Sequence, residues 1–68
     1  MNCTILIEHD DDAEFFEQCM VRKNIHFEYE VIGDKYLYYE FTISIEDEKA
    51  VELIIATNNI TILNFKSN

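Results

Sequence analysis

Proline and tryptophan are absent from this chain of 68 residues, and glycine occurs only once, at Gly33. A loop that holds phosphate groups with its backbone amides needs several glycines, so a nucleotide-binding loop of that kind is excluded. The lack of proline, together with abundant isoleucine, asparagine, acidic residues and tyrosine, is typical of proteins from AT-rich genomes. Many small proteins of phages and low-GC bacteria have this composition.

Basic residues are scarce, because five lysines and arginines stand against fourteen aspartates and glutamates, for a formal net charge of -9. Such a charge repels the phosphates of nucleic acids and anionic membrane surfaces. We therefore expect no direct binding to nucleic acid and no membrane association. The charge favours a protein partner with a basic surface, which is a host protein if the chain is phage-encoded.

Cysteine occurs only at Cys3 and Cys19, which lack the C-x-x-C spacing of a redox pair or half of a metal site. Both fall on faces expected to point inward, where cysteine acts as a small hydrophobe. No signal peptide or transmembrane run is recognisable, so the expected setting is reduced and cytoplasmic, or the host cytoplasm for a phage protein. No cofactor and no metal site are predicted.

Residues 25–43 form the longest alternating segment, which predicts a β-hairpin with one apolar and one acidic-aromatic face. The expected inward side chains are Ile25, Phe27, Tyr29, Val31, Leu37, Tyr39, Phe41 and Ile43. The expected outward side chains are His26, Glu28, Glu30, Tyr36, Tyr38, Glu40 and Thr42. The turn is expected at Gly33.

The register of this hairpin follows from the rule that residues paired across strands share a face of the sheet. A two-residue turn would mix the two faces, whereas a three-residue loop over residues 33–35 unites the apolar side chains by pairing Val31 with Leu37. In that register Glu28 lies opposite Glu40, and this pairing of like charges lowers the stability of the fold by roughly 0.3 kcal/mol. The outer face of the hairpin is therefore expected to be acidic.

The rest of the chain predicts a first strand over residues 3–8, a helix over 12–23, a second helix over 46–57 and a last strand over 60–65. Asp11 and Glu14 have capping-box spacing at the first helix, and Ser44 and Asp47 mark the start of the second. The order strand, helix, strand, strand, helix, strand predicts a single α+β domain, residues 1–68. Its architecture is the ferredoxin-like sandwich, a four-stranded antiparallel sheet with both helices on one face.

The face of the sheet that the helices leave open is expected to carry apolar side chains as well as acids. Leu6, Leu63 and Phe65 are predicted to lie there with tyrosines of the hairpin. Because this surface is more apolar than contact with water requires, we expect it to bind protein, either a second copy in a homodimer or a different chain.

The acidic run at residues 10–14 begins like a calcium-binding loop but does not continue as one. The sixth position of such a loop needs glycine and is Phe15, and the twelfth needs a bidentate glutamate and is Val21. The favoured interpretation is a solvated helix N-terminus, where carboxylates interact well with the helix dipole. A small metal-dependent hydrolase, with His9 and Asp10 at the end of the first strand, remains an alternative.

These features favour a non-enzymatic acidic module that binds protein, such as a phage-type inhibitor or modulator of a host protein. The expected partner-binding residues are Glu28, Glu30, Tyr36, Tyr38, Glu40, Asp10, Asp11, Asp12 and Glu14. A nucleic-acid mimic is the alternative, although carboxylates two apart on a strand recur at about 6.7 Å, against one charge per about 3.4 Å along a DNA strand. The acidity also has a simpler explanation, which is solubility.

Overall fold

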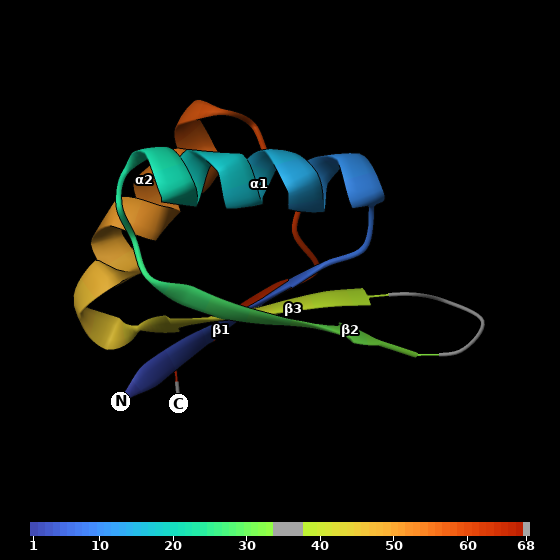
Figure 1. Cartoon of the computed structure of the whole chain (residues 1–68), viewed down its shortest axis with the longest axis horizontal. Coiled ribbons are helices and arrows are strands. Elements are labelled where there is room, and N and C mark those ends of the chain that lie inside the picture. The colour runs from blue at the N-terminus through green and yellow to red at the C-terminus, as the bar shows by residue number, and fades with distance from the viewer. Residues whose placement is uncertain (34–37, 68) are drawn as a thin grey trace.

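A computed structural model describes residues 1–33 and 38–67 of the chain. Its elements are β1 (Asn2–Ile7), α1 (Asp10–Arg22), β2 (Phe27–Ile32), β3 (Tyr38–Ser44), the 3₁₀ turn η1 (Ile45–Asp47), α2 (Glu48–Thr57) and β4 (Asn64–Ser67). The strands form one antiparallel sheet in the order β2-β3-β1-β4. Both helices lie on the same face of it (Figure 1). The predicted α+β, ferredoxin-like arrangement is confirmed.

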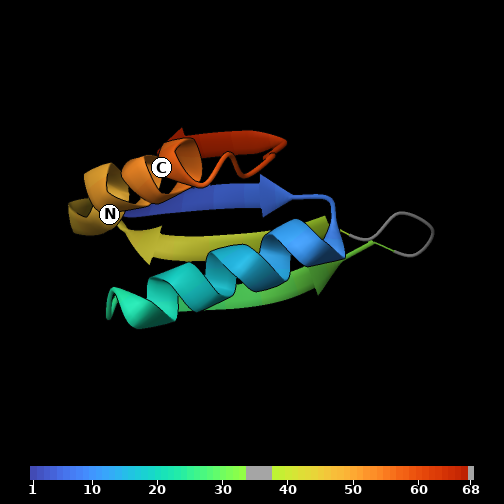
Figure 2. The ribbon, with the colours of Figure 1, turned by 90° about the horizontal axis from the view of Figure 1, so that it is seen from above.

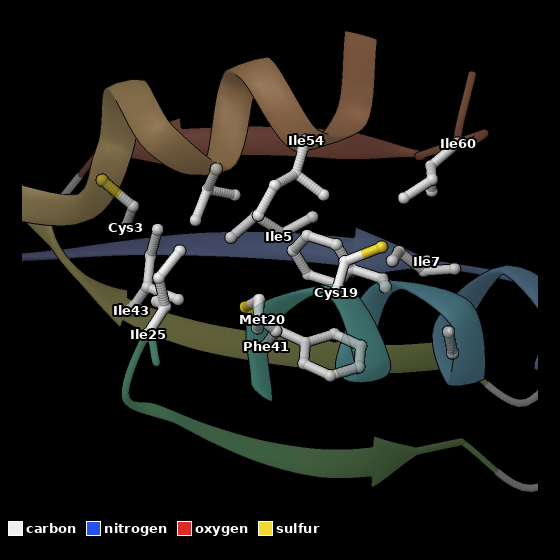
Figure 3. Close-up of a cluster of buried hydrophobic side chains, with 13 residues drawn as sticks. Cys3, Ile5, Ile7, Cys19, Met20, Ile25, Phe41, Ile43, Ile54 and Ile60 are labelled. Atoms are coloured by element: carbon white, nitrogen blue, oxygen red, sulfur yellow. The ribbon is translucent and has the colours of Figure 1, made fainter. Parts of the chain in front are cut away.

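The core lies between the sheet and the two helices (Figure 3). Its buried side chains are Cys3, Ile5, Ile7, Ala13, Phe16, Cys19, Met20, Ile25, Phe41, Ile43, Val51, Ile54 and Ile60. The central strand β1 contributes three of them, Cys3, Ile5 and Ile7, each fully buried. As predicted, every second residue of β1 points toward the helices, because side chains alternate across a strand.

Helix α1 begins two residues earlier than predicted, at Asp10 rather than at residue 12. The backbone of His9 is extended, and no side chain caps the helix. Asp10, Asp11 and Asp12 instead occupy the first turn, where negative charge interacts favourably with the positive end of the helix dipole. The helix ends as expected: Asn24 takes a positive φ of 59°, and the amide of Ile25 donates to the carbonyl of Met20.

Helix α2 is preceded by η1, which the sequence prediction merged with the helix. The Ser44 hydroxyl accepts a 3.3 Å hydrogen bond from the Glu46 amide, so Ser44 caps this short turn. The helix stops after Thr57, and Asn59 has a positive φ of 56°, which confirms the predicted end. On α2, Val51 and Ile54 are buried, while Leu53 is exposed.

The hairpin register differs from the prediction by two residues. Val31 pairs with Tyr39 rather than with Leu37, and Glu30 rather than Glu28 lies opposite Glu40. A shift of two residues leaves every side chain on its predicted face, because the alternation in a strand has a period of two. The face pattern therefore could not distinguish the two registers. The predicted turn at residues 33–35 extends outside the described residues.

The last strand corrects the prediction more strongly. It was expected over residues 60–65 with Phe65 on the open face, but β4 covers Asn64–Ser67, and Phe65 pairs with Ile5 on the helix-covered face. Ile60 and Ile62 contact the core from outside the strand, and the chain bends at Leu63 before the strand begins. The bend restarts the alternation in the opposite phase, which reverses the face of Phe65.

Two adjacent phenylalanines of α1 test the packing. Phe16 is fully buried, with its ring edge-on to Phe41 at 5.0 Å between centroids, whereas Phe15 is 39% exposed. Phe16→Leu is expected to lower the free energy of unfolding by about 1–3 kcal/mol, because it leaves a gap and removes the ring contact. Phe15→Leu is expected to change it by less than about 0.5 kcal/mol. Urea denaturation measures both, and equal losses would contradict this packing.

Candidate functional site

Strand β2 forms one edge of the sheet. One side of it pairs with β3, and no strand of the described part of the chain pairs with the other (Figure 2). Three of the eight large hydrophobic side chains exposed in the described residues belong to this strand of six residues: Tyr29, Val31 and Ile32. Exposed apolar side chains beside an unpaired strand edge are a common feature of binding surfaces.

A hollow of about 340 Å³ lies beside β2 on the open face of the sheet. It is lined by Glu28, Glu30, Glu40, Thr42 and Tyr29. Glu30 and Glu40 are paired directly across the two strands, so their Cβ atoms lie about 5 Å apart. No lysine or arginine of the described residues lines this hollow, which therefore has a strongly negative potential.

A second groove, of about 300 Å³, lies on the other face of the sheet, between α1 and strands β2 and β3. Its lining residues are Asp10, Ala13, Glu14, Glu17, Tyr29, Tyr39 and Phe41. The Tyr39 hydroxyl donates a hydrogen bond to the Asp10 carboxylate, which ties the start of α1 to the sheet. The strands therefore line the groove with aromatic side chains, and α1 lines it with acidic ones.

Tyr29 belongs to both hollows and is 51% exposed. Its ring stacks on Phe41 at 5.4 Å and on Tyr39 at 6.5 Å between centroids, so packing on one side holds it in place. Acids flank it on both faces of the sheet. We call this region the β2 edge site, made up of Tyr29 with Glu28, Glu30 and Glu40 on the open face and Glu14 and Glu17 on the helix face.

The structure brings together five of the predicted partner-binding residues at or beside this site. Glu28, Glu30 and Glu40 share the open-face hollow, while Asp10 and Glu14 line the helix-side groove. Tyr38 pairs with Ile32 on the open face, near the end of the hairpin. Asp11 and Asp12 lie in the first turn of α1 and line neither hollow. Tyr36 lies outside the described residues.

Sequence reasoning missed Tyr29 and Glu17 as members of the site. Tyr29 was assigned to the buried face, and it does point to the helix side, but α1 does not cover it fully. The signal that could have identified it is its place on an edge strand of the predicted topology. Glu17 lies one turn after Ala13 and shares the groove with Glu14.

The predicted dimer face is not a continuous patch. Leu6 pairs with Glu40 and Asn64 on the open face, as expected, and is half-buried. Phe65 lies on the helix-covered face and packs against the core, and Leu63 is exposed in the segment before β4. Phe65 lies on the other face because the alternation of side chains changes phase at the bend before β4. Homodimer formation stays a prediction, but Leu6, Leu63 and Phe65 do not form a shared interface for it.

The histidine and acidic side chains that a metal-dependent hydrolase would need are not gathered at one point in the described residues. Within residues 1–33 and 38–67, no three histidine, cysteine or acidic side chains are grouped so that they could hold a metal ion. His9 and His26 are both exposed. Among the described helices, none has the length and apolar character needed to span a bilayer.

A separate polar cluster joins β1, α2 and β4. The Ser67 hydroxyl donates to the Glu48 carboxylate at 2.5 Å, and the thiol of fully buried Cys3 donates to the same oxygen at 3.3 Å. Burial, together with the bond to Glu48, raises the pKa of Cys3, so the thiol stays protonated and is a poor nucleophile. The bond from Ser67, followed by that from Cys3, lowers the pKa of Glu48.

This cluster predicts a pH-dependent contribution to stability. The folded-state pKa of Glu48 lies below its ordinary value of 4.5, so the bond stabilises the fold above about that pH and is lost as the pH falls through the lower folded-state value. Ser67→Ala is expected to lower the urea midpoint at pH 7 and to have a much smaller effect at pH 3. Ser44→Ala removes a bond to a backbone amide instead, so its effect should change little with pH. The same pH dependence in both variants would contradict the assignment.

Comparisons with protein-family models, with curated proteins and with solved structures find no match to this chain.

Proposed function

We propose that this protein is a non-enzymatic binding module that recognises a basic surface of another protein through the β2 edge site. The observation that supports the proposal is the half-exposed, stacked ring of Tyr29 beside the acidic helix-side groove, with Glu28 and Glu30 on the opposite face of the same edge strand. Aromatic side chains held rigidly at a surface lose little entropy on binding and are frequent anchors of interfaces.

The acids around the ring supply the charge complementarity. Glu30 and Glu40 oppose each other, an arrangement that costs the free protein stability and that a cation placed between them would relieve. A negative potential of this kind also attracts a basic partner during diffusion and raises the association rate. Binding is therefore expected to weaken as the salt concentration rises.

The composition suggests one particular form of this proposal. In that form the partner is a host protein, and the chain is a phage-encoded inhibitor or modulator that acts in the host cytoplasm by covering the basic surface of its target.

The proposal is tested by removing charge at the site and, separately, far from it. Glu28→Gln with Glu30→Gln is expected to weaken binding of a fluorescent peptide rich in lysine and arginine about tenfold, because two charged contacts of about 0.7 kcal/mol each are lost. Glu46→Gln with Glu52→Gln removes the same net charge and should weaken binding less than about twofold. Fluorescence anisotropy at physiological salt measures both.

Equal loss in the two double variants would mean that only the total charge of the protein matters. That outcome would contradict the proposed site and would leave solubility as the explanation of the acidity.

A further inference from the structure

We propose that the basic partner binds as an added β-strand along the free edge of β2, with basic side chains at every second position. This inference rests on the proposed function and specifies how the partner is recognised. Strand addition uses the backbone of an exposed edge for affinity and alternate side chains for specificity. The unpaired edge of β2, among the described residues, supplies the first of these requirements.

The two edges of the sheet differ in a way that favours β2. Strand β4, at the other edge, has only four residues, and among them are Asn64, Lys66 and Ser67. A short polar edge that carries lysine is a usual protection against added strands. Strand β2 has six residues and exposes Tyr29 and Val31, at 51% and 46%. It therefore offers the longer and more apolar edge.

The open-face side of β2 sets the charge of the added strand. A strand adds at about 4.8 Å from its neighbour, and its side chains on one face repeat at about 6.7 Å. Glu28 and Glu30 repeat at this same spacing along β2 and are both exposed. Lysine or arginine at every second position of the added strand would therefore lie opposite both carboxylates, with Glu40 one strand further in.

The helix-side residues of the added strand meet a different surface. They lie opposite Phe27, Tyr29 and Val31, which form an apolar row on that face. The residue opposite Tyr29 borders the groove beneath Glu14 and Glu17, where its side chain would cover the exposed half of the ring. The segment that fits both faces alternates basic with apolar residues.

A second copy of this chain fits the edge poorly. Antiparallel self-pairing of β2 centred on residue 28, 29 or 30 places a glutamate directly opposite a glutamate of the other copy, because Glu28 and Glu30 are two of the three open-face residues of this strand, with Ile32 the third. Like charges in direct opposition destabilise strand pairing. The same carboxylates that would attract a basic strand therefore disfavour pairing between copies.

The experiment uses a seven-residue peptide in which valine alternates with lysine or arginine, capped at both ends. Two derivatives carry N-methyl groups on alternate residues, one set on the basic positions and the other on the valines. In an antiparallel pair only every second residue donates its amide to the neighbouring strand. One derivative is therefore expected to lose binding at least tenfold while the other binds within about threefold of the parent, as measured by anisotropy.

Two further measurements complete the test. A peptide of the same composition with its basic residues clustered should bind at least fivefold more weakly than the alternating peptide. Amide hydrogen exchange should slow at alternate residues of β2 when the alternating peptide is bound, and should not change at β4.

The outcomes separate this inference from the proposed function. Equal binding by both N-methylated peptides and by the clustered peptide, with Glu28→Gln and Glu30→Gln still weakening binding, would overturn strand addition and leave the acidic site intact. No binding by any of the peptides would overturn both. Concentration-dependent self-association that buries β2, seen by sedimentation and hydrogen exchange, would also overturn the inference, because a second copy would then occupy the edge.

Discussion

The packing of Phe41 fixes which residues of this protein face solvent. Its ring is fully buried, and it contacts Phe16 of α1 edge-on and Phe27 of β2 at 5.8 Å between centroids. It also pairs with Ile5 at the centre of the sheet. Because side chains alternate along a strand, burying Phe41 beneath the helices forces Glu40 and Thr42 onto the opposite face. The acidic open face is thus a consequence of where the core is anchored.

The helix layer is narrower than the sheet, and this difference creates the second half of the β2 edge site. Helix α1 lies over β2 and β3, and α2 over β1 and β4 (Figure 2). Burial falls from Phe41, which is fully enclosed, to Tyr29 on the neighbouring strand, which is half-exposed. The two rings stack on each other, so the exposed ring is supported by the core. Tyr29 is therefore presented to solvent in a fixed orientation.

The pattern of apolar and polar residues was sufficient to predict the order of the elements and the faces of β1, β2 and β3. The predicted C-terminal ends of both helices were correct to within one residue, whereas their starts were not. The pattern could not give the hairpin register, because a slip of two residues preserves every face. It also failed at Phe65, where a bend outside any regular element reversed the phase. The half-exposure of Tyr29 depends on how far α1 extends across the sheet, which a local pattern does not contain.

The glutamates of β2 reconcile two needs that usually conflict at the edge of a sheet. An edge that carries Tyr29 and Val31 invites pairing with other chains, and natural proteins oppose this with charge. Lysine at these positions would repel basic strands, whereas Glu28 and Glu30 repel acidic strands, including a second copy of β2. Their cost, the opposition of Glu30 and Glu40, falls on the free protein and is reduced when a cation lies nearby. If the proposed strand addition occurs, an edge with this charge would disfavour pairing between copies and would discriminate among partners by the sign of their charge.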